Sequence, residues 1–155
     1  MFNHQPPDYI CPVCTKLIAG IEDERNALSD IVYQNEHVIA SIAPKWWVSN
    51  PGHVLVMPKQ HYENLYDIPD DVLSEIYSVA KQIAIAMRNT YDCQGTSTRQ
   101  HNEPAGDQDL WHMHVHVFPR YDNDDLYTNH DNIRYTTPVE RAPYSEKLRT
   151  YLERA

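Results

Sequence analysis

One segment near the middle of the chain carries the clearest helical pattern of apolar and polar positions. Pro69 suits the first helical position, and Asp70 and Asp71 favour the positive end of the helix dipole. The apolar residues that follow recur every three or four positions, the spacing that aligns side chains on one helix face. They are Val72, Leu73, Ile76, Ala80, Ile83 and Met87. The pattern predicts an amphipathic helix that packs one face against a sheet.

Short runs rich in β-branched and aromatic residues predict strands on both sides of this helix. They cover residues 31–33, 37–42, 53–57, 96–100 and 111–118. Gln34-Asn35-Glu36 predicts a hairpin between the first two strands, and Pro51-Gly52 predicts a turn before the third. Strands that follow one another with few helices indicate an antiparallel α+β domain.

The composition changes after Arg120 to Asp, Asn, Tyr and Thr, with few aliphatic residues. A final helix is predicted at about residues 144–152, with four apolar side chains on one side: Tyr144, Leu148, Tyr151 and Leu152. The pattern divides the chain into a domain at residues 8–122 and a C-terminal extension with a short helix at residues 123–155.

Composition narrows the function classes. The chain has 155 residues, 41 % of them apolar, and a formal net charge of −9. This acidic balance argues against a protein that binds nucleic-acid polymers or anionic membrane surfaces. No apolar run approaches the roughly 20 residues of a membrane helix, and residues 1–8 lack the parts of a signal peptide. We therefore expect a cytoplasmic protein.

Three of the nine histidines alternate with apolar residues in one short segment. His112, His114 and His116 lie two positions apart, so a strand would place all three on one face, with neighbours about 7 Å apart. Two chemistries fit this arrangement. Two imidazoles and a third ligand can hold a catalytic zinc, or one imidazole can itself be the nucleophile.

The residues also match a known family. His112–Phe118 resembles the signature of the histidine-triad (HIT) superfamily, in which three histidines alternate with apolar residues. Asn50–His61 resembles the family's second block, and Pro119-Arg120 its usual exit from the triad. Ala105-Gly106, followed by Gln108, resembles its approach to the triad. The resemblance runs from about residue 11 to residue 121 and does not cover the C-terminal extension.

The resemblance implies a fold and a class of substrate. The expected fold is a five-stranded antiparallel sheet with helices on one face, paired into a ten-stranded sheet in a homodimer. The expected activity is nucleotidyl hydrolysis or transfer at the α-phosphate of a nucleoside phosphoramidate or a dinucleoside polyphosphate.

Residue roles follow from the same resemblance. His114 matches the nucleophile that forms a nucleotidyl-histidine intermediate, His116 the histidine that stabilises phosphoryl oxygens, and His53 a fourth histidine that orients the triad. The expected nucleotide-binding side chains are Gln108, Asn102 and Gln100.

Cys11 and Cys14 form a Cys-x-x-Cys pair that, taken alone, indicates either a metal site or a redox site. A redox site of the thioredoxin kind needs a βαβ context, which is missing here. Some bacterial members of the HIT superfamily bind zinc through such a pair and two histidines, which correspond here to His61 and His112. The resemblance thus implies a closed structural Cys₂His₂ zinc site.

Several positions depart from the family pattern. Ala43 lies where a ribose-binding carboxylate is common, and Asp109 lies where Ser or Thr is common, so the substrate range stays open. Trp46 and Trp47 could stack on a base or serve the core or a dimer contact. Two alternatives to a hydrolase of this type also remain: a nucleotide-binding module without catalysis, and a hydrolase with a His-ligated catalytic zinc.

Overall fold

The computed structural model describes residues 2–155, and five strands form its central sheet. They are β1 (Ile31–Gln34), β2 (Val38–Ile42), β4 (Val54–Pro58), β5 (Gly95–Gln100) and β6 (Val115–Arg120). The sheet order is β1-β2-β4-β6-β5, and every neighbouring pair is antiparallel. The α+β class and the five-stranded antiparallel sheet are therefore confirmed.

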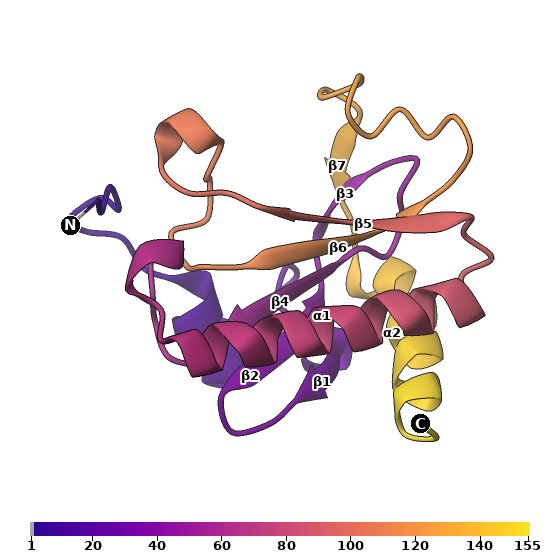
Figure 1. Cartoon of the computed structure of the whole chain (residues 1–155), viewed down its shortest axis with the longest axis horizontal. Helices are drawn as coiled ribbons and strands as arrows, with labels where there is room; N and C mark the ends of the chain where they lie inside the picture. Colours follow the sequence, from indigo (N-terminus) through magenta and orange to yellow (C-terminus); the bar gives the residue numbers. More distant parts are fainter. Residues whose placement is uncertain (1) are drawn as a thin grey trace.

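The two α-helices, α1 (Asp70–Thr90) and α2 (Pro138–Leu152), pack together and cover the same face of the sheet, as Figure 1 shows. The predicted stripe of α1 is confirmed, because Ile76, Ala80, Ile83 and Met87 are buried in the main core. On the strands, the residues that alternate toward this core include Val54, Val56, Val115 and Val117. The histidines between them therefore point to the opposite face.

That opposite face is partly covered by the N-terminal segment. The short π-helix η1 (Val13–Ile18) buries Val13 and Leu17 against Ile39 and Met57 in a second, smaller cluster. Gly20 follows η1 with φ +71°, a left-handed conformation that suits glycine. Three 3₁₀ turns connect other elements: η2 (Leu28–Asp30), η3 (Leu65–Asp67) and η4 (Pro104–Gly106).

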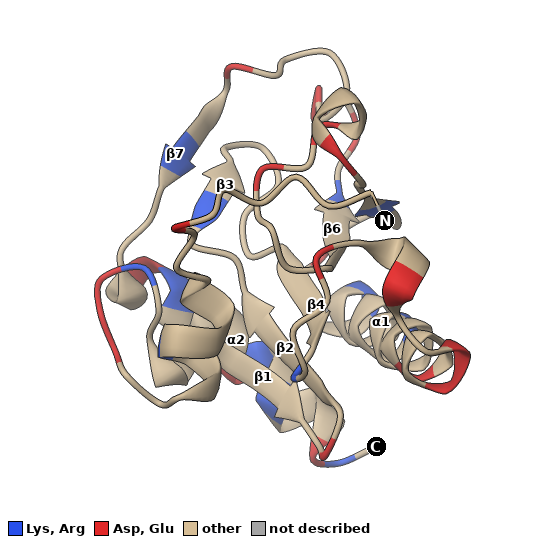
Figure 2. Ribbon diagram, turned by 90° about the vertical axis from the view of Figure 1, so that its left-hand side faces the viewer, with Lys and Arg blue, Asp and Glu red and all other residues tan. Residues whose placement is uncertain are grey.

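A small two-stranded sheet was not predicted from the sequence. In it β3 (Lys45–Trp47) pairs antiparallel with β7 (Ile133–Tyr135). The two strands lie far apart in the sequence and are only three residues long, so neither has a recognisable pattern of its own. Figure 2 shows basic residues on both strands, whereas most acidic residues lie in loops and at helix ends.

Several predicted boundaries are wrong. The histidine-bearing strand begins at Val115 rather than Trp111, because the backbone N–H of Met113 donates to the Tyr62 carbonyl oxygen instead of joining the sheet. The same strand continues through Pro119 to Arg120. Helix α2 begins at Pro138 rather than Tyr144.

The early start of α2 has a local cause. The Thr137 side chain accepts a hydrogen bond from the Glu140 backbone N–H, and the Glu140 carboxylate accepts one from the Thr137 N–H. This capping box fixes the start of the helix, while Pro143 inside it removes only one backbone hydrogen bond. At α1, Pro69 is the N-cap rather than the first helical residue.

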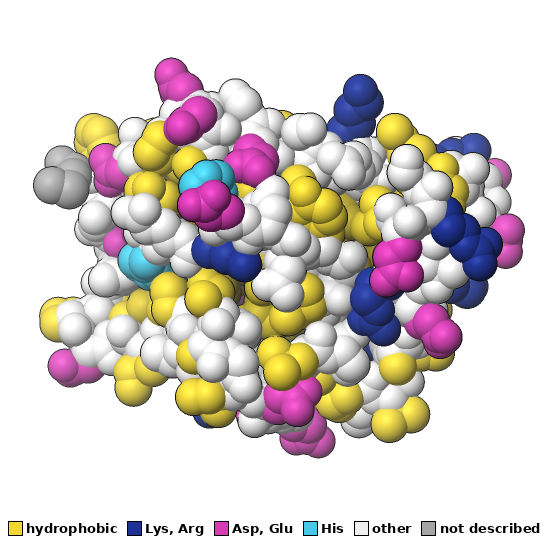
Figure 3. All heavy atoms as spheres, turned by 90° about the horizontal axis from the view of Figure 1, so that it is seen from below, with side chains coloured by type: hydrophobic (Ala, Val, Ile, Leu, Met, Phe, Trp, Pro, Cys, Tyr) yellow, Lys and Arg dark blue, Asp and Glu magenta, His cyan; other side chains and the backbone are white. Residues whose placement is uncertain are grey.

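Charged side chains are spread over one face of the molecule (Figure 3). Acidic side chains are dispersed over the face that Figure 3 shows, between basic and apolar ones, rather than gathered in one cluster. Among residues 2–155, no helix has the length and apolar character needed to cross a membrane.

Candidate functional site

Three histidines meet on the open face of the sheet. His116 lies within β6, His114 immediately precedes that strand, and His53 immediately precedes β4. The Nε2 atoms of His114 and His116 are 3.1 Å apart, and the ring centroids of His53 and His116 are 5.4 Å apart. Alternation along β6 and the pairing of β4 with β6 thus bring together the side chains predicted to be catalytic.

Hydrogen bonding defines the tautomer of His114. Its Nδ1 lies 2.8 Å from the His112 carbonyl oxygen, which can only accept, so Nδ1 carries the proton. In the neutral ring Nε2 then keeps a lone pair, and it accepts a hydrogen bond from Nε2–H of His116. Because His114 lines the cavity, an electrophile that displaces the hydrogen bond from His116 can reach this lone pair.

The surroundings hold these imidazoles in the neutral state. Burial, followed by the nearby Arg99 guanidinium and His114, lowers the pKa of His53 to about 3. Burial is also the main reason that the pKa of His116 lies well below its usual range, with further contributions from His114, His53 and Arg99. The pKa of His114 is lowered by burial and partly raised again by its bond to the His112 carbonyl. A neutral imidazole is the form that acts as a nucleophile.

These histidines line a cavity of about 730 Å³. The sheet forms its floor, η1 and the loop after it form one wall, and β3 with residues near β7 forms another. Ala43 and Asp109, the two departures from the family pattern, both line it. The Asp109 carboxylate lies 3.4 Å from the Lys45 ammonium, which offsets its charge.

The three expected nucleotide-binding side chains lie outside the lining of this cavity. The amide of Gln108 is buried, donates to the carbonyl oxygens of Glu63 and Leu110, and accepts from the Glu103 N–H. Gln100 and Asn102 hydrogen bond to each other, and Asn102 also accepts from the Leu65 N–H. In this structure all three side chains hold the loop between β5 and β6, and their contact with a nucleotide stays a prediction.

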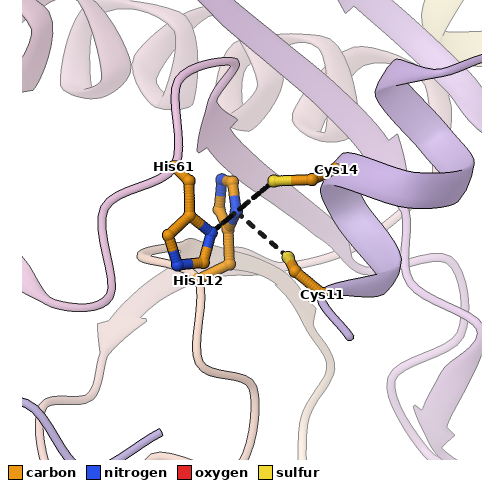
Figure 4. Close-up of side chains that lie close together, drawn as sticks. All are labelled: Cys11, Cys14, His61 and His112. Carbon is orange, nitrogen blue, oxygen red and sulfur yellow. Dashed lines mark hydrogen bonds between the residues drawn. The ribbon is translucent and has the colours of Figure 1, made fainter. Parts of the chain in front are cut away.

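A second cluster lies beside the triad. Cys11, Cys14, His61 and His112 converge from the N-terminal segment, the loop after β4 and the segment before β6, as Figure 4 shows. Their ligand atoms all lie within 4.8 Å of one another. His112 Nδ1 is 3.4 Å from the Cys11 sulfur, 3.6 Å from the Cys14 sulfur and 3.2 Å from His61 Nδ1.

The donor set and its geometry fit a tetrahedral zinc. Typical Zn–S and Zn–N bond lengths place the ligand atoms about 3.3–3.8 Å apart around such an ion. His112 Nε2 donates to the Pro58 carbonyl oxygen at 2.8 Å, which leaves Nδ1 free to bind a metal. Burial and the neighbouring Cys11 raise the pKa of the Cys14 thiol to about 12, so a bound cation is needed to hold it as a thiolate.

The two tryptophans have different surroundings. Trp46 is buried in the main core, with its ring 5.2 Å from that of Tyr144, as the core alternative predicted. Trp47 lines the cavity, and its ring is 5.9 Å from that of His53.

Sequence reasoning missed several residues that line the cavity. Arg99 lies directly opposite His116 in the pairing of β5 with β6, and Arg25, Lys45 and Tyr135 line the wall near β3 and β7. The strand at residues 96–100 was predicted, but its register against the histidine strand was not. A register follows from loop geometry and packing rather than from the pattern of one strand.

Comparison with known proteins places the chain in a family. The family model of the HIT domain matches residues 24–123. The protein hit of Bacillus subtilis is 34 % identical over 115 residues, which are 74 % of each chain. The adenosine 5'-monophosphoramidase of Saccharomyces cerevisiae is 38 % identical over 72 residues, 46 % of this chain and 42 % of that protein.

A solved structure shows the same relationship. The zinc-bound histidine triad family protein from Mycobacterium smegmatis superimposes with a TM-score of 0.75 at 25 % identity, over 93 % of this chain and 94 % of that one. The sheet topology, the alternating histidines and these matches agree that the chain belongs to the HIT domain family.

Proposed function

We propose that this protein is a nucleotidyl hydrolase or transferase of the histidine-triad type. It acts at the α-phosphate of a nucleoside phosphoramidate or a dinucleoside polyphosphate. The observation that carries the proposal is the setting of His114, which lines the cavity and whose protonated Nδ1 binds the His112 carbonyl oxygen, so that Nε2 keeps the lone pair. The named activity of the yeast relative, an adenosine 5'-monophosphoramidase, supports this class of substrate.

The reaction proceeds in two displacements. In the first, the His114 Nε2 lone pair forms a bond to the α-phosphorus, and the bond from phosphorus to the leaving group breaks. The leaving group keeps the bonding electrons and takes up a proton. In the second, a water oxygen attacks the same phosphorus and releases a proton, and the P–N bond to His114 returns its electrons to the ring. The product is a nucleoside monophosphate, and two easier steps replace one difficult step.

His116 and His53 complete this proposal. The Nε2–H of His116 lies 3.1 Å from the attacking nitrogen and is placed to donate to a phosphoryl oxygen as the bond forms. His53 packs against His116 and stacks on Phe118 with centroids 4.5 Å apart, so it orients the ring of His116.

We also propose that Cys11, Cys14, His61 and His112 hold a structural zinc. Four protein ligands leave no open position for a water, which argues against the alternative of a catalytic zinc. The ligands clamp the N-terminal segment, one wall of the cavity, onto the segment that leads to His114. The zinc-bound structural relative from M. smegmatis supports this assignment.

The protein is further proposed to act as a cytoplasmic homodimer. Strand β5 lies at the edge of the sheet over six residues, and an unpaired edge of this length is a template for pairing with a second copy. Sedimentation equilibrium is expected to give twice 18.1 kDa, and a monomer at micromolar concentration contradicts the dimer. Fractionation of cells that express a tagged chain tests the location.

Covalent labelling tests the mechanism. The chain is mixed with a panel of nucleoside phosphoramidates and dinucleoside polyphosphates labelled at the α-phosphorus, and the protein is quenched at short times. We expect a burst of label on the native protein and none on His114→Ala, whose turnover falls by at least about 10³-fold. The control is His37→Ala, which removes an exposed hairpin histidine.

Other outcomes identify the alternatives. If the native protein binds nucleotide but is never labelled and does not turn over, the binding module without catalysis is correct. If His114→Ala keeps both its zinc and its turnover, the nucleophile has been assigned wrongly.

A further inference from the structure

Four unpartnered polar atoms lie together at one end of the cavity. Within residues 2–155, eight buried side-chain nitrogen or oxygen atoms have no hydrogen-bond partner. Half of them belong to residues that line this cavity: Trp47 Nε1, Arg99 Nε, His53 Nδ1 and His116 Nδ1. We call these four residues the Arg99 subsite. Buried polar groups are nearly always paired, so such a cluster indicates a ligand.

The four residues are neighbours through strand pairing and ring stacking. Arg99 on β5 pairs with His116 on β6, so both side chains leave the same face of the sheet as close neighbours. The Arg99 guanidinium carbon lies 4.7 Å from the ring centroid of Trp47 and 4.6 Å from that of Phe118. The Phe118 ring in turn stacks on both His53 and His116.

Charge indicates what kind of ligand is missing. No carboxylate among residues 2–155 lies within 4.0 Å of an Arg99 nitrogen, whereas Lys45 on the same cavity is paired with Asp109. Arg99 is therefore a cation beside the triad without a carboxylate partner, and one of the other three unpartnered nitrogens of the subsite, Trp47 Nε1, is a hydrogen-bond donor.

We propose that Arg99, assisted by the Trp47 N–H, binds the phosphate group of the nucleotide on which His114 acts, and is thus a further substrate-binding residue. This deepens the proposed function and rests on it. The planar guanidinium donates to two phosphate oxygens at once, and such charged hydrogen bonds are stronger than neutral ones. The aromatic rings of Trp47 and Phe118 hold the guanidinium in place before the substrate arrives.

Binding measurements separate this role from a purely structural one. Calorimetry is run with whichever of AMP, GMP, CMP and UMP the native protein binds most tightly, and with the matching nucleoside, which lacks the phosphate. Arg99→Gln is expected to weaken nucleotide binding by about 10- to 100-fold and to leave nucleoside binding within twofold. Arg99→Lys keeps the charge and is expected to fall between Arg99→Gln and the native protein.

Arg88→Gln is the matched control, because it removes the same charge from an exposed position near the end of α1. It should change neither binding constant. The inference is overturned if Arg99→Gln binds the nucleotide as the native protein does, if nucleotide and nucleoside binding fall together, or if Arg99→Lys binds as poorly as Arg99→Gln.

An error in the proposed reaction would be recognised separately, from the native protein's binding of mononucleotides and its hydrolysis of conjugates. If the native protein binds a mononucleotide but hydrolyses no conjugate, the proposed reaction is wrong, and the calorimetric comparison still decides the role of Arg99. If it binds none of the four mononucleotides, both proposals are wrong.

Discussion

At the scale of single residues, His53 makes the stability of the fold depend on pH, because its imidazole is buried next to the Arg99 guanidinium. Its pKa is about 3 in the fold and near 6.5 in an unfolded chain. The unfolded state therefore binds a proton first as the pH falls. The stability associated with neutral His53 is complete above pH 6.5 and is lost progressively between pH 6.5 and pH 3.

Denaturant unfolding between pH 7.5 and 4.5 checks this sign. The native protein is expected to lose stability below pH 6.5, whereas His53→Asn has no imidazole at this position and should lose less, by up to about 1.4 kcal/mol per pH unit. Loss of zinc in acid would destabilise both proteins equally, because both keep the four cluster residues. The difference between their stabilities therefore reports on His53 alone. Parallel curves would show that His53 does not titrate as described.

The site residues that could be predicted from the sequence are those whose spacing forms a recognisable motif. Cys11 and Cys14 are three positions apart, and the triad residues alternate, so a short motif names them and the fold then brings them together. Arg99 has no such motif. Its importance comes from lying opposite His116, and that register is set by the whole sheet. Gln108 has the expected position in the sequence, yet its amide is engaged by the loop backbone.

At the scale of elements, α2 is attached to the domain by a buried ion pair. Arg141 is fully buried, with Nε and Nη2 each 2.9 Å from an oxygen of Asp30, the last residue of η2. Arg141 also donates to the carbonyl oxygens of Thr136 and Glu24. The composition of residues 123–155 predicts an extension, and this division of the chain stays a prediction. The helix in this segment nevertheless packs into the main core through Leu148.

Replacing Arg141 tests the attachment. Arg141→Met leaves the Asp30 carboxylate buried without its partner, and we expect a loss of about 3–5 kcal/mol in the free energy of unfolding. Arg134→Met breaks the exposed pair of Arg134 with Glu140 near the start of the same helix and should cost at most about 1 kcal/mol. Similar losses in both variants, measured by urea unfolding, would contradict a special role for the buried pair.

At the scale of the whole molecule, the proposed zinc site links three parts of the chain that are distant in sequence. It joins the N-terminal segment to the loop after β4 and to the residues that precede His114. The hydrophobic cluster under η1 is small, so bonds to the proposed zinc would supply much of the stability of this wall. Zinc binding to the folded form alone adds to the stability of that form.

Removal of the metal is therefore expected to destabilise the folded protein. The change is Cys14→Ser, compared with Cys93→Ala, which removes a core thiol 79 positions away in the sequence and leaves the cluster intact. We expect Cys93→Ala to retain one zinc per chain and Cys14→Ser to retain less. The melting temperature of Cys14→Ser should fall, and its N-terminal segment should become sensitive to protease.

The time course of activity distinguishes a structural from a catalytic ion. After treatment of the native protein with a chelator, a structural zinc predicts that activity disappears together with the near-ultraviolet circular dichroism of the tryptophans, and that residual folded protein is still labelled at His114. A catalytic zinc predicts full loss of activity while the spectrum is unchanged. Because all four ligand positions around the ion are filled by protein, the first result is expected, and the second would reassign both the zinc and the chemistry of the cavity.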